Sequence, residues 1–366
     1  MRLALTGMGA ITSVGRTADT ACAAIRAGIA RPRKVKGFAL VDEESQERIA
    51  LMGHPIQGYT EGFHLVGRWL RLAGGCLGEL LAQPGLLPEA SDKRFWASTL
   101  LIAVLPPLDA DIFLSSEEQL PEVVRKAYLL PLLGMLERPI AHQDAKLVTV
   151  GHAGTALALQ EGMQRLAGSS LERILLVSVD SWFDPLLLQR LANSRRLKCE
   201  ESPTGLMPGE AGVCLLLESE AGARRRGAAV HAVVTGVATG QETENSPGGA
   251  RGSARALSTC LRILLGRESK GLLPFRGDIY SDLNGEEWRA LEWGSARVSL
   301  SDLLAEPRMH LPCAAVGDTG AASGALGVCL AAQDLRGRWA RTGQSVVLSR
   351  SERGAVGSIL LQAEGS

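Results

Sequence analysis

The sequence predicts an α/β fold made of two similar halves, and three features indicate this. Apolar segments such as RILLVSVDS (173–181) are continuous rather than alternating, which is typical of strands in a sheet that is buried on both faces. Segments with the apolar spacing of helices lie between them. After Ala221 the order of strand, helix, strand, glycine-rich turn, helix and strand pair starts again. We therefore expect parallel strands covered by helices in each half.

The first half, placed at residues 1–222, begins with a short apolar strand and a glycine-rich turn. Two stretches interrupt its pattern and are expected to be insertions, a polar and irregular one at about 31–62 and a cap at about 106–140. The expected strands are 3–6, 94–106, 145–150, 173–181 and 211–219, and the expected helices are 17–30, 63–85, parts of 116–137 and 153–167.

The second half, placed at residues 223–366, should repeat this order. Its polar stretch GQETENSPGGARGS (240–253) is expected to be a surface loop before a helix. The expected strands are 232–240, 278–281, 344–351 and 357–363, and the expected helices are 253–266 and a small-residue helix within 317–335.

The composition is that of an ordinary soluble globular protein, with 366 residues, 46% hydrophobic residues and a formal net charge of +0. Zero net charge gives no electrostatic reason to expect nucleic acid or an anionic membrane as a partner. The N-terminus lacks a long apolar signal region, and no apolar run reaches the roughly 18 to 20 residues of a membrane span. We expect a cytoplasmic protein with reduced cysteines, because its cysteines lie in apolar runs without paired spacing.

The segment LVTVGHAGTALALQEG (147–162) has the pattern of a buried strand, a tight turn and the start of a helix. Such an elbow is a usual place for a nucleophile, because the turn exposes one side chain beside free helix N–H groups. Here the exposed position holds His152, between Gly151 and Ala153. The elbow is therefore either an active site or the position of one that has been lost.

Three further segments, together with this elbow, resemble the β-ketoacyl-acyl-carrier-protein synthases, the condensing enzymes of the thiolase superfamily. ALTGMGAITSVG (4–15) resembles their opening strand and turn, LMPGEAGVCLLLE (206–218) their glycine-rich hairpin, and GDTGAASGALGV (317–328) a helix start. The segments follow the family order and span nearly the whole chain. The resemblance implies a duplicated five-layer α-β-α-β-α fold, a homodimer, and an acyl carrier protein as a possible partner.

The resemblance also implies where the catalytic residues of the family would lie. Those enzymes use a cysteine at the elbow and two histidines, and these positions match His152, Asn284 and Asp318 here. The family lysine falls near Cys313. Every one of these positions departs from the family pattern, while the scaffold glycines remain.

Three other residues are singled out by the same comparison. The closing glycine-rich loop of the family reads SRSERGA here, with Arg350 and Glu352 in place of small and aromatic residues. Glu210, in the hairpin, is expected to anchor backbone N–H groups rather than to take part in chemistry.

The replacements argue against condensation by the family route. That route needs a thiolate to hold the acyl chain, whereas an acyl-imidazole hydrolyses easily. A carboxylate at Asp318 would repel the developing negative charge that a histidine stabilises. The first hypothesis is therefore a non-catalytic binding, scaffold or accessory protein. Its partner would be an acyl carrier protein or an active synthase, as for a chain length factor, or a secreted effector, as for accessory proteins of type VI secretion.

Two enzymatic hypotheses stay open. In the first, the chain is a hydrolase or acyltransferase that uses His152 with Asp318 as a general-base pair, Asn284 as an amide donor, and Thr155 or a water as nucleophile. In the second it is a 3-oxoacyl-carrier-protein synthase whose cysteine lies elsewhere. We expect no cofactor and no metal. The turn at 6–15 has no G-x-G-x-x-G motif, and His54, His64 and His142 have no ligand spacing.

Overall fold

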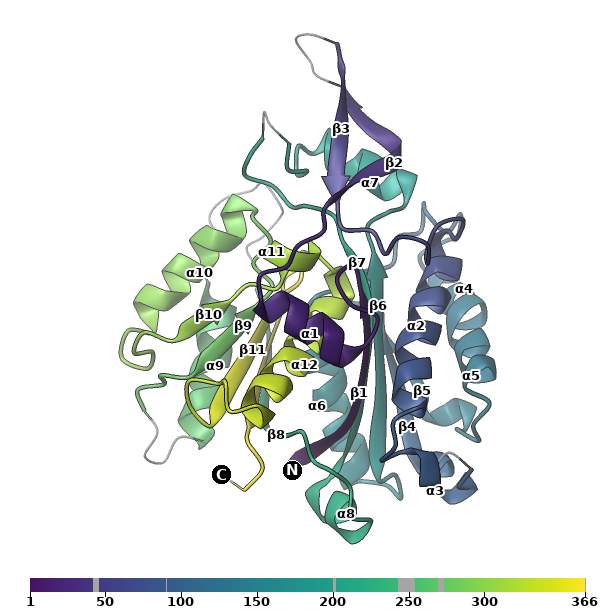
Figure 1. Ribbon diagram of the computed structural model, residues 1–366, viewed down its shortest axis with the longest axis vertical. Coiled ribbons are helices and arrows are strands. Elements are labelled where there is room, and N and C mark those ends of the chain that lie inside the picture. The colour runs from purple at the N-terminus through teal and green to yellow at the C-terminus, as the bar shows by residue number, and fades with distance from the viewer. Residues whose placement is uncertain (42–45, 90, 200–201, 243–253, 269–272, 366) are drawn as a thin grey trace.

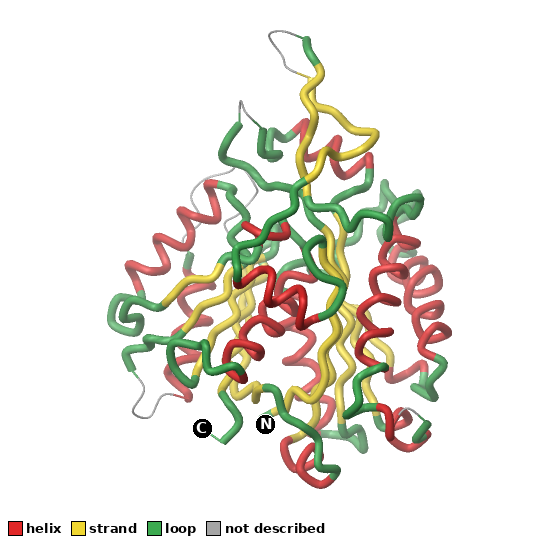
Figure 2. Tube along the Cα trace, in the orientation of Figure 1, coloured by secondary structure: helices red, strands yellow, loops and turns green. Residues whose placement is uncertain are grey.

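The computed structural model describes residues 1–41, 46–89, 91–199, 202–242, 254–268 and 273–365 (Figures 1 and 2). Before residue 226 the strands are β1 (Leu3–Thr12), β2 (Arg33–Val41), β3 (Arg48–Gly53), β4 (Thr99–Val104), β5 (Ala145–Val148), β6 (Arg173–Ser181) and β7 (Glu210–Ser219). The helices there are α1 (Ala18–Arg26), α2 (Leu65–Leu81), α3 (Lys93–Ala97), α4 (Leu120–Val124), α5 (Leu130–Leu136), α6 (Gly154–Ala167), α7 (Pro185–Asn193) and α8 (Glu220–Arg225), with short turns η1 (Leu87–Glu89), η2 (Arg125–Leu129) and η3 (His142–Asp144).

The C-terminal part contains a second set of elements. Its strands are β8 (Ala232–Gln241), β9 (Asp278–Ser281), β10 (Arg308–His310), β11 (Gln344–Arg350) and β12 (Ala355–Gln362). Its helices are α9 (Arg255–Glu268), α10 (Glu287–Ser299), α11 (Cys313–Val316) and α12 (Ser323–Arg336), preceded by the short turn η4 (Gly320–Ala322).

The main sheet repeats one topology twice. In the described part of the chain its order is β10-β9-β11-β12-β8-β1-β7-β6-β4-β5. Numbered along each set of five strands, both segments have the order 3-2-4-5-1 from the sheet edge to the middle. In this numbering, strand 2 of each segment pairs in parallel with strands 3 and 4, and strand 4 pairs antiparallel with strand 5. The middle strands β1 and β8 also pair antiparallel, which joins the segments. This confirms the predicted duplicated α/β fold.

The helices form three layers around these two sheet segments (Figure 1). Helices α2 and α5 cover the outer face of the first segment, and α9 and α10 cover the outer face of the second. Helices α6 and α12 pack in the middle, where their small and aliphatic side chains contact both segments. The arrangement is the five-layer α-β-α-β-α fold that the resemblance implies.

Glycines allow the outer helix α2 to lie close against the sheet. A Cβ atom at Gly9 of β1 would lie 2.1 Å from the carbonyl oxygen of Cys76. A Cβ atom at Gly212 of β7 would lie 2.4 Å from the carbonyl oxygen of Leu72. A side chain at either strand position would therefore push the α2 backbone away.

The structure differs from the sequence-based expectation at several places. The first strand continues to Thr12 through the stretch expected to be a glycine-rich turn. Residues 31–62, expected to be irregular, contain the β2–β3 hairpin, which projects from one end of the molecule (Figure 2). The expected cap at 106–140 contains α4, η2 and α5, and its buried Tyr128 and Leu132 join the outer layer around Trp69 of α2. The expected strand at 94–106 begins as α3, because Asp92 accepts a hydrogen bond from the Arg94 N–H and caps a helix.

Two further expectations concern the polar loop and membrane spans. The loop expected at 240–253 lies mostly outside the described residues, which resume at 254. Among the helices that the structure describes, none has the length and apolar character needed to cross a membrane.

Candidate functional site: a buried polar cluster at the elbow

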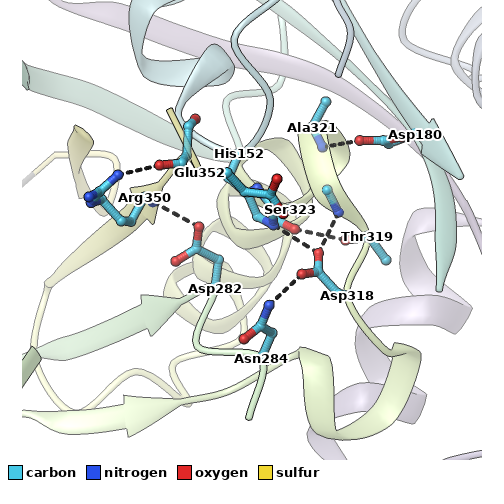
Figure 3. A network of polar contacts seen from close by, with 12 residues as sticks. His152, Asp180, Asp282, Asn284, Asp318, Thr319, Ala321, Ser323, Arg350 and Glu352 are labelled. Carbon is cyan, nitrogen blue, oxygen red and sulfur yellow. Dashed lines mark hydrogen bonds and ion pairs between the residues drawn. The ribbon is translucent and has the colours of Figure 1, made fainter. Parts of the chain in front are cut away.

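His152 occupies the predicted elbow between β5 and α6. Gly151 has a φ of +76°, a left-handed conformation that a glycine adopts without strain, and its N–H donates to the carbonyl of Leu105. The turn directs the imidazole toward the centre of the molecule, where it is 2% exposed. Its Nε2 atom lies 2.8 Å from Oδ1 of Asp318 (Figure 3).

Asp318 lies at the matching place in the second set of elements, just before η4 and α12. Its Oδ1 also accepts a hydrogen bond from the Gly320 N–H at 2.7 Å. Its Oδ2 accepts one from the Asn284 amide at 2.6 Å. Both carboxylate oxygens therefore have partners. The structure thus brings together His152, Asn284 and Asp318, the three positions that the resemblance singles out, and links them through Asp318.

The cluster continues through a chain of ion pairs. The Asn284 amide also donates to Glu286 at 3.1 Å, and Glu286 accepts two hydrogen bonds from Arg196 at 2.6 and 3.0 Å. The same guanidinium donates to Glu352 at 2.5 Å. The segment after β11 is therefore tied to the loop after β9 by one arginine.

Arg350 is the last residue of β11 and is buried. Its guanidinium donates to Glu292 of α10 at 2.9 Å, and its backbone N–H donates to Asp282 at 2.8 Å. The buried Arg289 donates to the Arg350 carbonyl at 2.7 Å and lies 3.5 Å from Asp282. Two arginine side chains thus lie buried among carboxylates beside the cluster. This packing leaves the end of β11 fixed.

The charges of the cluster shift the pKa values of its central pair. Burial alone would lower the pKa of His152, but the adjacent Asp318 carboxylate outweighs it and raises the pKa above its ordinary value. Burial alone would raise the pKa of Asp318, yet His152, Arg289 and the Asn284 amide hold it far below its usual range. Below the ordinary histidine pKa of about 6.5 the pair is thus an imidazolium and a carboxylate.

A cavity beside the cluster is very small. It has a volume of about 10 Å³, and Cys313, Thr319 and Ser323 are among the residues that line it. That volume holds at most one water molecule. Burial and the carboxylates of Asp318 and Asp282 raise the pKa of the Cys313 thiol well above its ordinary value. The elbow therefore holds an imidazole, and the nearby thiol stays protonated near neutral pH.

Thr155, a candidate nucleophile, does not contact His152 through a hydrogen bond. It lies on α6 and is fully buried, and its hydroxyl has no hydrogen-bond partner within the described ranges. A Cβ atom at Gly324 of α12 would lie 2.9 Å from the Thr155 Cβ atom, so the side chain packs against that helix. A nucleophile must be within hydrogen-bond reach of its base. The Thr155 hydroxyl has no such hydrogen bond to His152.

Glu210 lies at the start of β7 and is completely buried. One carboxylate oxygen accepts hydrogen bonds from the Ile56 N–H at 2.7 Å and the Thr60 hydroxyl at 2.6 Å. The other accepts from Arg68 at 2.9 Å and the Ser181 hydroxyl at 2.8 Å. Glu210 thus fixes the segment that follows the β2–β3 hairpin against the end of the sheet.

Asp180 was not singled out from the sequence, because it ends an ordinary apolar strand. Its carboxylate is buried and accepts hydrogen bonds from the Ala321 and Ser181 N–H groups, both at 2.8 Å. Burial raises its pKa to about 7 against the effect of these donors. A Cβ atom at Gly320, where φ is +52°, would lie 2.0 Å from the carboxylate. Asp180 therefore holds the turn that positions Asp318.

The three histidines considered as metal ligands lie apart in the fold. His54 is buried against the segment around Gly317, and its Nδ1 has no hydrogen-bond partner within the described ranges. Burial lowers the pKa of His54 to about 4, so this imidazole is neutral. His64 precedes α2, and His142 begins η3. The described residues contain no group of three or more His, Cys, Asp or Glu side chains placed to hold a metal.

Comparisons with known proteins support the fold. No protein-family model and no curated protein matches the sequence. Solved structures do match. The ishigamide ketosynthase/chain length factor has a TM-score of 0.77 at 18% identity, over 100% of this chain and 99% of that one. The AntDE:AntF complex, described as a type II polyketide synthase acyl-carrier protein with its ketosynthase bound to the hexaketide, gives 0.76 at 14%, over 99% of each chain. A β-ketoacyl synthase from Burkholderia phymatum STM815 gives 0.75 at 14%, also over 99% of each chain. The chain therefore has the thiolase-like fold of ketosynthases and chain length factors.

Proposed function

We propose that this protein is a ketosynthase-fold binding partner that does not condense acyl units and that acts with an acyl-carrier system, in the manner of a chain length factor. The observation that supports this most directly is the elbow. His152 and Asn284 are both hydrogen-bonded to Asp318, and all three side chains are buried.

The chemistry of condensation explains why this arrangement is inactive in that reaction. An acyl chain must be held covalently by a nucleophile, with room for the chain beside it. Here the elbow side chain is a buried imidazole bound to a carboxylate at 2.8 Å, so it is not free to take up an acyl group. The developing negative charge of an enolate would also face Asp318 instead of a hydrogen-bond donor.

The partner is inferred from the solved structures with the same fold. One of them is described as a ketosynthase/chain length factor, and another as a ketosynthase in complex with an acyl-carrier protein. We propose an acyl carrier protein or an active synthase as the partner of this chain. This choice is favoured over a secretion effector because one of these structures is described in complex with an acyl-carrier protein.

We also propose that the chain pairs with itself or with a synthase through β5. In the described part of the sheet β5 is an edge strand, paired only with β4. An edge strand presents unpaired N–H and C=O groups that favour addition of another strand. Analytical ultracentrifugation tests this. A dimer that is lost when Leu147 is replaced by Pro supports the proposal, and a monomeric wild-type chain with no strand-added synthase complex contradicts it.

The test of the main proposal measures turnover and binding separately. The full chain is incubated with acyl-coenzyme A thioesters, and release of free thiol is followed beside that of the His152→Ala variant. We expect the same background rate for both. Binding of holo-acyl carrier protein and of a carrier-dependent synthase is measured by calorimetry, and we expect saturable binding of at least one. Turnover that disappears in His152→Ala, or binding of neither protein, contradicts the proposal.

The His152–Asp318 pair favours one alternative, a hydrolase that activates a water. A histidine oriented by a carboxylate is a general-base arrangement, and their 2.8 Å contact fits it at pH values above the raised pKa of His152, where the imidazole is neutral. In that case both His152→Ala and Asp318→Asn lose thioester hydrolysis. Under the main proposal neither variant changes a rate, because there is none to change.

A further inference from the structure

A polar cavity lies at the base of the β2–β3 hairpin, separate from the elbow. It has a volume of about 320 Å³. Its walls come from the turn after β1, the start of β2 and the segment that follows β3, which are far apart in the sequence. It shares no lining residue with the His152 cluster, and the inference drawn from it does not depend on the proposed function.

Three arginines line this cavity, namely Arg16, Arg31 and Arg33. Arg16 donates to the Gln57 carbonyl at 2.9 Å, which holds its guanidinium at the wall. Arg31 and Arg33 are exposed to solvent, and within the described ranges their side chains have no ion pair or hydrogen bond to the protein. None of the described residues that line the cavity is acidic. Three like charges thus share one cavity without a protein counter-charge, which favours an anion there.

A serine also belongs to the wall of this cavity. Ser13 lines the same cavity, and its Oγ atom is buried without a hydrogen-bond partner within the described ranges. A buried hydroxyl without a partner is uncommon in native structures and needs an explanation. A bound ligand oxygen that accepts from Ser13 would supply the missing partner.

We propose that this cavity binds a small phosphate monoester, with the phosphate held by Arg31, Arg33 and Ser13. A phosphate ester carries a charge of about −1.5 to −2 near pH 7 and three acceptor oxygens, which suits several guanidinium groups and a hydroxyl. A carboxylate carries one charge and two oxygens and matches fewer of these donors. The volume of about 320 Å³ leaves room beyond a phosphate group for the body of a small molecule.

The experiment uses calorimetry on the full chain at constant ionic strength, with inorganic phosphate, glycerol 3-phosphate and succinate as probes. We expect saturable binding of both phosphates, tighter for the ester, and weaker binding of succinate. The Arg31→Gln/Arg33→Gln double variant should bind about a hundredfold more weakly, since each lost charged hydrogen bond is worth about tenfold. Arg297→Gln, which removes an exposed arginine of α10, is the matched control and should bind as the wild type does.

A second variant tests the site in case the double variant does not fold. Ser13→Ala removes one donor without changing charge, and about tenfold weaker phosphate binding is expected for it. Circular dichroism checks that both variants fold. Absence of saturable phosphate binding to the wild type, equal binding by the double variant, or equally tight binding of succinate would each overturn the proposal.

Discussion

The Asp318→Asn substitution tests whether the elbow is held by a charged pair. The Asn284 amide donates to Asp318 at 2.6 Å, and His152 contacts the other carboxylate oxygen. An asparagine at 318 has one oxygen and one NH₂ group. In one orientation its NH₂ group would face the Asn284 amide, and in the other it would face His152. A lost hydrogen bond to a charged group and a buried unpaired donor together amount to about 3 to 5 kcal/mol. We expect the free energy of unfolding to fall by that amount near pH 5.5.

The pH dependence gives the sharper signature. The folded-state pKa of His152 is raised, so its contribution to stability is complete below its unfolded pKa of about 6.5 and is lost as the pH rises through the folded value. The folded-state pKa of Asp318 is lowered, so its contribution is present above about 3.8 and is lost as the pH falls. The effect of Asp318→Asn should therefore be larger near pH 5.5 than near pH 9.

Urea unfolding of both proteins at the two pH values measures this difference. Asp302→Asn is the matched control, because Asp302 is exposed and pairs with Arg262 on the surface. It should change stability little at either pH. An equal effect of Asp318→Asn at both pH values, or one no larger than that of the control, would refute the reasoning.

Two further substitutions test the residues that hold the site in place. Gly320→Ala puts a Cβ atom 2.0 Å from the Asp180 carboxylate at a φ of +52°, so thermal unfolding should show a loss of about 2 kcal/mol or more, whereas Gly294→Ala, in an open helical position, should be neutral or stabilising. Equal melting temperatures for the two variants would show that the turn is not constrained. Glu210→Gln turns an amide toward Arg68 and removes the counter-charge, so urea unfolding should show a loss of about 3 to 5 kcal/mol. A loss within the error of the wild-type measurement would rule out an anchoring role.

Much of the fold follows from sequence pattern alone. Continuous apolar strands such as β4 and β6 have no polar face, so a sheet covered on both sides is their only stable environment. The glycines at 9 and 212 match the close approach of α2. The order of the elements repeats, and the duplicated topology follows from that repetition.

The β2–β3 hairpin could not be predicted in this way. Its strand RKVKGFALV (33–41) is exposed along most of its length, so the usual contrast between a buried and a solvated face is weak. The α3 helix was also missed, since its aromatic residues Phe95 and Trp96 favour a strand by propensity while the Asp92 cap determines a helix.

The places of His152, Asn284 and Asp318 at turns were predictable, but the contacts between them were not. His152, Asn284 and Asp318 stand at recognisable places in the chain, and local sequence suggests where each backbone turns. The hydrogen bonds that join them connect residues 34 and 166 positions apart in the sequence. The role of Asp180 rests on hydrogen bonds to a turn 141 residues later, which no local pattern reveals.

The most direct test of the central claim is the intact mass of the full chain after incubation with an acyl-coenzyme A thioester, followed by peptide mapping. We predict an unchanged mass, because the elbow holds a buried imidazole bound to Asp318 and the Cys313 thiol stays protonated near neutral pH. A mass increase equal to one acyl group, mapped to His152 or Cys313, would contradict the proposal that this chain binds a carrier system without acylating itself.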